Sequence, residues 1–204
     1  MSIAHKEQSL GMAGEAAHAT GRSLGWWGMV FFIASESLLF ANLIAGYLYI
    51  RVRAGTWPPP GGPLLERPFP FGGNYLIVIN TFILLGSSVP MIFAGRAVRS
   101  GRLKNLPWLI LTTIVMGAIF LSLQAVEYAT NGFGPSNGVL GSTFYALTGF
   151  HGAHVMVGLI FLLINFFRSL RGQFSKEKHF GFEAGEMYWH FVDIVWIFVF
   201  TLYT

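Results

Sequence analysis

Five long apolar segments, separated by short polar connections, dominate the pattern of this chain. They cover residues 24–50, 74–95, 106–128, 139–167 and 183–203. Each holds the roughly 20 residues that an α-helix needs to cross the hydrocarbon core of a bilayer. The pattern predicts an all-α integral membrane protein in which residues 24–204 form a single domain, a bundle of five transmembrane helices. The polar residues 1–23 have no apolar core, so we expect a short exposed tail rather than a signal peptide.

Composition supports a membrane class and excludes several others. Apolar residues make up 53% of the chain and charged residues 11%, against roughly 25% charged in an ordinary soluble domain. The chain has no Cys, which excludes disulfides, thiolate metal sites and a cysteine nucleophile. The net charge of +4 is of the size that basic membrane loops produce, so we expect no nucleic-acid partner.

The distribution of Lys and Arg predicts the orientation. Of the 13 Lys and Arg residues, ten lie in the tail and in the second and fourth connections, and three lie in the first connection. In a five-span chain the first group shares one side of the membrane. Cytoplasmic loops carry the excess of basic residues, so the N-terminus is predicted to be cytoplasmic and the C-terminus outside. The first connection, 51–73, is rich in Pro and Gly, and we expect it to be rigid and non-helical at the interface.

Polar side chains occur in the middle of these apolar segments, where they are costly. At 1.5 Å per residue, five of them lie about 12–24 Å from the inner ends of their segments and share one central layer: Glu36, His151, His154, His190 and Asp193. Gln124 and Glu127 lie nearer the outer surface. Residues three apart share a helix face, so Gln124/Glu127, His151/His154 and His190/Asp193 each act from one face.

Three interpretations fit this set of residues. Three histidines with a carboxylate have the donor types of a transition-metal or haem site. Ionisable groups inside a membrane also suggest a proton or ion pathway, as in a self-sufficient transporter. The third interpretation is a structural hydrogen-bonded network that fixes helix packing. Spacing alone leaves all three open.

Three longer motifs then resemble a known family. They are Phe120-Leu-Ser-Leu-Gln-Ala-Val-Glu-Tyr128, Gly141-Ser-Thr-Phe-Tyr-Ala-Leu-Thr-Gly-Phe-His-Gly-Ala-His-Val155 and Tyr188-Trp-His-Phe-Val-Asp-Ile-Val-Trp196. In order and in predicted orientation, they are similar to subunit III of the haem–copper terminal oxidases. Nearly everything after residue 25 takes part in the resemblance, and the chain looks like the shorter, five-helix bacterial form.

The resemblance implies an accessory, non-redox subunit of a proton-pumping oxidase that reduces dioxygen to water. It implies no catalytic residue, metal or cofactor in this chain, with haem and copper in partner subunits. Subunit III would pack beside subunit I in a complex with subunit II, hold phospholipid in a cleft and support proton uptake. On this basis Glu36 matches the family's membrane-buried glutamate, and Arg168 and Trp189 are expected to contact lipid.

The resemblance also makes the structural network the favoured role for the central polar residues, and it implies a bacterial cytoplasmic membrane. Glu186 stands where an apolar or small residue is expected. Near the inner interface it could snorkel or pair with a neighbouring Lys or Arg, and the resemblance gives it no role. A related accessory subunit of a nitric oxide reductase remains an alternative. The electron donor, cytochrome c or quinol, acts on the complex rather than on this chain, so the sequence does not identify it.

Overall fold

The computed structural model describes residues 24–57, 75–175 and 179–203. Within these ranges the chain is helical and has no strand, which confirms the all-α class. The elements are α2 (Leu24–Arg53), α3 (Tyr75–Ser100), the short 3-10 helix η1 (Leu103–Asn105), α4 (Leu106–Thr130), α5 (Gly138–Leu170) and α6 (Phe180–Tyr203). The predicted segment 74–95 extends to Ser100, and the predicted segment 183–203 begins at Phe180. The expected tail, 1–23, and most of the Pro-rich connection lie outside the described residues.

Two glycines end helices on the side that carries the excess of basic residues. Gly101 has φ +75° after α3, and Gly172 has φ +63° after α5. The backbone N–H of Arg102 donates to the Ala97 carbonyl at 2.9 Å, and that of Gln173 donates to the Arg168 carbonyl at 3.1 Å. A left-handed glycine followed by such a bond satisfies carbonyls that the helix end leaves free. The chain therefore reverses sharply, and the next helix returns beside the last.

Four of the described helical segments have the length and apolar composition of membrane spans. They are α2, α3, α4 with η1, and α5. Helix α6 is not among the four, and it carries the acidic residues Glu183, Glu186 and Asp193. Its 24 residues extend about 36 Å at 1.5 Å per residue, longer than the roughly 30 Å hydrocarbon core. The fifth span therefore remains a prediction, supported by the length of α6 and by its packing inside the bundle.

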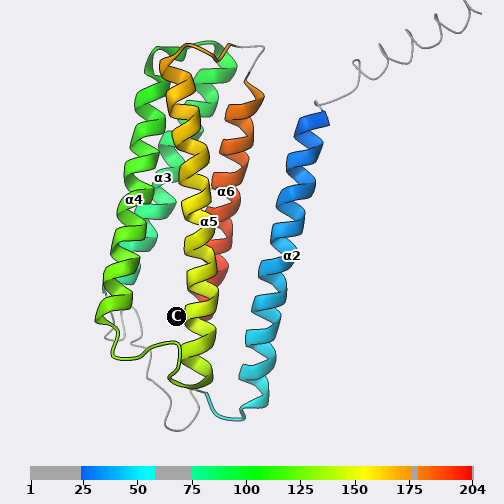
Figure 1. The fold of residues 1–204 in the computed structure, drawn as a ribbon, viewed down its shortest axis with the longest axis vertical. Coiled ribbons are helices and arrows are strands. Elements are labelled where there is room, and N and C mark those ends of the chain that lie inside the picture. The colour runs from blue at the N-terminus through cyan, green and yellow to red at the C-terminus, as the bar shows by residue number, and fades with distance from the viewer. Residues whose placement is uncertain (1–23, 58–74, 176–178, 204) are drawn as a thin grey trace, which may run out of the picture.

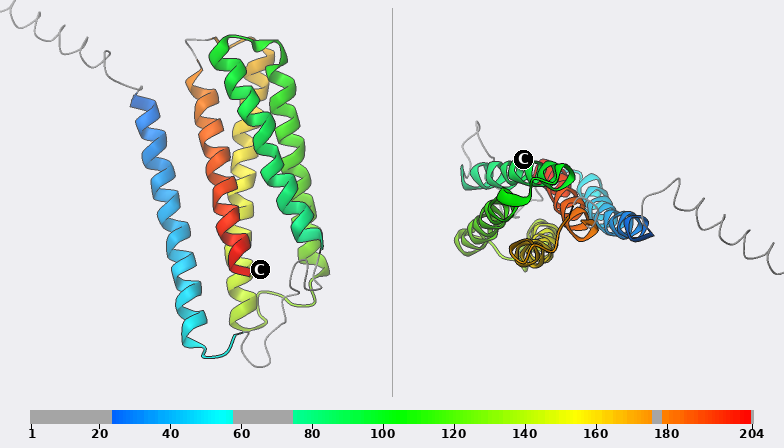
Figure 2. Two further views of the ribbon diagram at one scale, coloured as in Figure 1. Left: turned by 180° about the vertical axis from the view of Figure 1, so that it is seen from behind. Right: turned by 90° about the horizontal axis from the view of Figure 1, so that it is seen from above.

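The helices run up and down side by side, with sequence neighbours antiparallel (Figure 1). The start of α2 and the end of α6 lie at opposite ends of the bundle, as an odd number of spans requires. Which end faces the cytoplasm stays a prediction. Helix α6 contacts α2, α3 and α5, and α4 packs mainly on α3 (Figure 2).

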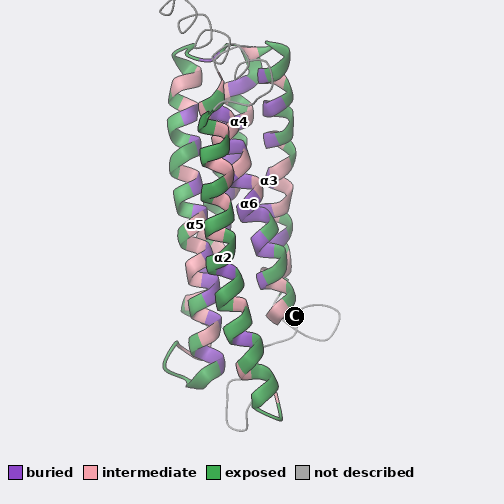
Figure 3. Ribbon diagram, turned by 90° about the vertical axis from the view of Figure 1, so that its right-hand side faces the viewer, coloured by how far each residue is buried: buried purple, intermediate pink, exposed green. Residues whose placement is uncertain are grey.

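Burial is concentrated on α6 and on the faces turned toward it (Figure 3). Helix α6 buries Trp189, Trp196 and Phe182 among others, whereas α2 buries only Phe40 and Tyr47 of its 30 residues. Large apolar side chains such as Phe82, 72% exposed, point outward. Outward apolar groups suit a hydrocarbon surrounding, so the polar groups inside the bundle are the ones that need partners.

Candidate functional site

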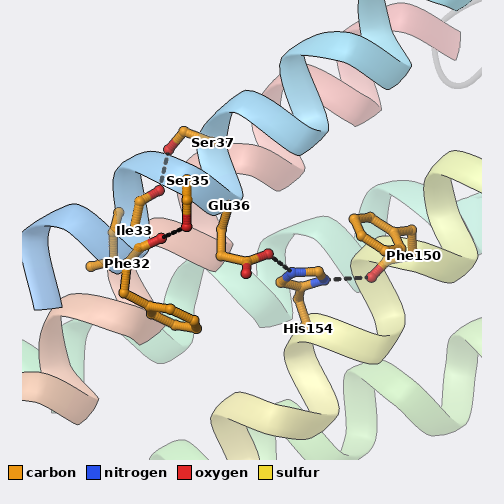
Figure 4. Close-up of polar contacts among 7 residues, drawn as sticks. All are labelled: Phe32, Ile33, Ser35, Glu36, Ser37, Phe150 and His154. Atoms are coloured by element: carbon orange, nitrogen blue, oxygen red, sulfur yellow. Dashed lines mark hydrogen bonds and ion pairs between the residues drawn. The ribbon is translucent and has the colours of Figure 1, made fainter.

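A carboxylate–imidazole pair joins α2 to α5 in the middle of the bundle (Figure 4). Oε2 of Glu36 lies 2.9 Å from Nε2 of His154. On the other side of the ring, Nδ1 of His154 donates to the Phe150 carbonyl at 2.8 Å. Nδ1 therefore carries a hydrogen, and one further proton, on the carboxyl or on Nε2, completes the bond to Glu36. The ring of Phe40 packs on the imidazole with 4.8 Å between centroids, and only 11% of the His154 side chain and 18% of the Glu36 side chain are exposed.

A second cluster joins α3 to α6. The Ser88 hydroxyl donates a short hydrogen bond to Oδ2 of Asp193, and its oxygen lies 3.2 Å from Nδ1 of His190. His190 and Asp193 do share a helix face, as their spacing predicted, but Ser88 is the group that binds them both. Among the described residues no hydrogen bond connects this cluster to Glu36 or His154. The predicted central layer is therefore divided into separate interhelical contacts.

Two tryptophans of α6 add further bonds to α3. The indole N–H of Trp189 donates to the Ser87 hydroxyl at 2.9 Å, and that of Trp196 donates to Thr81 at 3.0 Å. Trp189 is fully buried, with its ring between Gly117 of α4 and Gly158 of α5. Its side chain has no surface left for lipid, so the expected lipid contact of Trp189 is not supported by the structure. Trp189 is a packing residue of the bundle centre.

The remaining predicted polar residues, His151, Gln124 and Glu127, are buried and take no part in the hydrogen bonds described above. His151 is fully buried and its ring lies 4.8 Å from that of Trp196, but neither ring nitrogen has a partner among the described residues. Gln124 and Glu127 are each only 4% exposed. Nearby, the hydroxyls of Tyr128 and Thr148 lie 2.6 Å apart and join α4 to α5. No three His, Asp or Glu side chains within the described ranges are grouped as a metal site would require.

Glu186 has a partner that explains its place near the start of α6. Its Oε2 lies 3.1 Å from Nη1 of Arg99, near the end of α3. The carboxylate also lies against Gly95, where a Cβ would overlap it. The sequence left snorkelling and pairing with a Lys or Arg both open, and it did not identify the partner. The signal was present, since the end of α3, with Arg99, and the start of α6, with Glu186, lie at the same end of the bundle.

A pocket of about 380 Å³ lies between the start of α2, the end of α5 and the start of α6. Its walls are largely apolar and glycine-rich, including Phe32, Phe161 and Gly28. Arg168 and Asn165 are its polar members, and no acidic residue lines it. The guanidinium of Arg168 rests over the Phe174 ring at 5.0 Å and its Nε donates to Gln173 at 3.3 Å. An apolar pocket with one cation at the membrane edge has the chemistry to take an acyl chain and an anionic phosphate.

Serine and threonine residues of α3 are the functional groups that sequence analysis missed. Thr81 and Ser88 are seven residues apart and lie on the face of α3 that meets α6. Two small hydroxyl residues at that spacing mark an interhelical hydrogen-bonding face. That signal was available in the sequence.

Comparison of the sequence with known proteins identifies its family. The family model described as cytochrome c oxidase subunit III matches residues 7–204. The protein named cytochrome c oxidase subunit 3 of Bos taurus is 40% identical over 180 residues, which cover 85% of this chain and 66% of the relative. Its counterpart in Anopheles gambiae is 42% identical over 183 residues, 87% of this chain and 68% of the relative. The chain thus spans slightly less than two thirds of the bovine relative. It belongs to the cytochrome c oxidase subunit III family.

Proposed function

We propose that this chain is an accessory, non-redox subunit III of a membrane-bound respiratory terminal oxidase. Family membership supports this role. In the proposed complex the chain packs beside subunits I and II, in a bacterial cytoplasmic membrane. Haem and copper belong to those partner subunits, and the electron donor, cytochrome c or quinol, acts on the complex. The isolated chain is not catalytic.

The observation that carries the mechanism is the set of separate polar contacts between helices. Glu36–His154 fastens α2 to α5, and Ser88–His190–Asp193 fastens α3 to α6. A proton pathway needs a continuous chain of hydrogen-bonding groups, whereas a scaffold needs each pair of helices to be joined. The separation favours a rigid scaffold over a self-sufficient transporter.

The pocket beside Arg168 is the second part of the proposal. In the proposed mechanism it holds a phospholipid against the faces of α2, α5 and α6, and the bound lipid stiffens the bundle where α2 is least buried. The guanidinium binds the phosphate, and the apolar wall formed by Phe32, Phe161 and their neighbours takes an acyl chain. A scaffold of this kind protects subunit I during turnover and supports its proton uptake.

Replacing Glu36 with Gln or Ala tests the scaffold. Glu36→Ala removes the only described bond of this carboxylate, to His154, so α2 loses its polar contact with α5. We expect less subunit III in the purified oxidase and faster loss of activity during turnover. Ser37→Ala is the matched control, because its hydroxyl bonds only the Ile33 carbonyl of the same helix. Wild-type retention and wild-type inactivation kinetics in Glu36→Ala would refute the scaffold mechanism.

Arg168→Gln tests the lipid pocket. Gln keeps most of the polar volume but has no charge for a phosphate, so the variant oxidase should co-purify with less phospholipid, measured by mass spectrometry of extracted lipid. Arg171→Gln, one turn further at the end of α5, is the control, because Arg171 does not line the pocket. Equal phospholipid content in the two variants would exclude Arg168 as the headgroup contact.

A further inference from the structure

One face of α6 is exposed along the membrane depth and carries a single histidine among apolar residues and one threonine, whose hydroxyl bonds a carbonyl of its own helix. The face is formed by Met187, His190, Ile194, Ile197 and Thr201, which we call the outer seam; each is at least partly exposed. It lies on the opposite side of α6 from Gly185, which contacts Asn165 of α5. Helix α6 itself lies between α2 and α3, with much of α2 exposed beside it (Figure 3).

The hydrogen bonds of the second cluster fix which ring nitrogen of His190 is free. The Ser88 hydroxyl has one hydrogen and donates it to Asp193. With Asp193 ionised, that hydrogen is not available to His190, so the imidazole donates in the 3.2 Å contact between its Nδ1 and the Ser88 oxygen. A neutral imidazole that donates through Nδ1 has an acceptor at Nε2. None of the described residues hydrogen-bonds that acceptor.

The depth of His190 makes this free acceptor costly. At 1.5 Å per residue His190 lies about 15 Å from the start of α6 and about 20 Å from its end. Hydrocarbon offers no hydrogen-bond donor at that depth, and an unsatisfied polar group there costs as much as a lost hydrogen bond. A neighbouring protein helix can supply a hydrogen-bond donor at this depth, where there is no water.

The spacing of the outer seam fits such a helix. Its members follow one another at intervals of three, four, three and four residues. This is the 3.5-residue repeat by which two helices pack along a left-handed crossing, in membranes as in soluble coiled coils. One polar residue within such a repeat fixes the register of the partner.

A second copy of this chain is the wrong partner. Two-fold pairing of outer seams would bring one Nε2 acceptor toward another, and two acceptors form no hydrogen bond without a further proton. The partner must present a donor.

We propose that the outer seam of α6 docks a transmembrane helix of a different subunit, which donates a hydrogen bond from a hydroxyl or an N–H group to Nε2 of His190. This inference rests on the proposed function, because the different subunit is another chain of the oxidase. Beyond that function, the inference states that the outer seam of α6 is the face covered by the partner helix, and that Nε2 of His190 sets the register between the two helices.

Photocrosslinking in the fully assembled oxidase tests the docking. Benzoyl-phenylalanine replaces Ile194, 55% exposed in the outer seam, and, as the control, Ile119 of α4, which is 42% exposed. We expect the probe at 194 to form a product with another subunit, mapped by peptide mass spectrometry to the middle of a transmembrane helix that carries a donor. The control sets the yield at a position outside the outer seam. A yield at 194 no higher than the control, or a product joining two copies of this chain, would overturn the docking while leaving the proposed function intact. Absence of the wild-type chain from the purified oxidase would overturn the proposed function itself.

Substitution of His190 separates docking from internal stability. His190→Leu should reduce retention of the chain after detergent washing by roughly five- to tenfold, the effect of one net hydrogen bond. His190→Gln, which can still present an acceptor, should restore most of the retention. Ser88→Ala breaks the internal bonds of the cluster without changing the His190 side chain, so its loss of retention measures the scaffold contribution alone and should be smaller than that of His190→Leu. Retention of His190→Leu equal to that of Ser88→Ala would overturn the proposal.

Discussion

The contact between Gly117 and Trp189 gives the sharpest prediction about stability. A Cβ at position 117 would lie 2.5 Å from Cη2 of Trp189 and 2.9 Å from Cδ2 of Leu159. Carbon atoms pack best at about 3.5–4.0 Å, so the ring would have to move by roughly 1 Å. The ring has little room on its other side, where it packs closely on Gly158. Even the Cβ of an alanine at position 158 would lie only 3.0 Å from it. Movement would also stretch the 2.9 Å bond from the indole to Ser87.

These constraints set the magnitude for Gly117→Ala. Overpacking a core by one methyl group costs typically about 1–3 kcal/mol, and loss of one buried hydrogen bond adds about 1 kcal/mol. We expect a loss of about 2–4 kcal/mol in the free energy of unfolding. Gly152→Ala is the matched control, because its Cβ would meet Leu121 at 3.8 Å, an ordinary contact. That variant should change stability by no more than about 1 kcal/mol, in the favourable direction, since Ala is the better helix former.

Unfolding by SDS titration in mixed micelles, followed by far-ultraviolet circular dichroism, measures both variants. Trp189→Phe supplies the second test, because the smaller ring lacks the atoms that position 117 would meet. Gly117→Ala should then cost less in the Trp189→Phe background than in the wild type, a non-additivity of about 1–2 kcal/mol. Equal stability of Gly117→Ala and Gly152→Ala, or strict additivity with Trp189→Phe, would refute the steric argument.

Three further outcomes follow from named contacts. Trp196→Phe removes a buried indole bond to Thr81, and we expect a loss of about 1–3 kcal/mol in SDS titration, with Thr81→Val showing a similar loss if the bond is the cause. Tyr47→Phe removes the hydroxyl bond to a last-turn carbonyl of α6 at 3.1 Å; a loss of about 0.5–1.5 kcal/mol is expected, and an unchanged unfolding midpoint would show that the bond contributes nothing. Gly95→Ala places a methyl group against the Glu186 carboxylate; it should lower the midpoint in the wild type, and much less when Glu186 is also replaced by Ala.

The fold was largely predictable because its determinants are local. Apolar runs longer than the bilayer core define the helices, and Gly101 and Gly172 mark where two of them end. Helix α6 was also predicted, although its three acidic residues weaken the apolar signal. The structure shows why α6 tolerates two of these acidic residues inside the bundle: Glu186 and Asp193 have partners on α3.

The polar contacts were only partly predictable, because sequence fixes depth but not which helices are neighbours. Glu36, His154 and Asp193 do come from similar depths, yet Glu36 faces α5 while Asp193 faces α3. Ser88 gave no strong signal by itself, since a hydroxyl in a membrane helix is often satisfied by its own backbone. Trp189 was expected beside lipid, but the small residues Gly117 and Gly158 open a space for its ring at the bundle centre.

The Glu36–His154 pair has a consequence for how the chain is made. The two residues are 118 positions apart, so at 5–20 residues per second roughly 6–24 s separate their synthesis. Helix α2 must therefore enter the membrane with an unpaired glutamate, at a cost of about 3 kcal/mol that only its own apolar residues can offset. Helix α2 therefore gains its polar contact with the bundle only after α5 has been inserted. A nascent chain halted between these two positions would present a membrane helix with an unpaired polar group, a state that quality control can distinguish from the completed bundle.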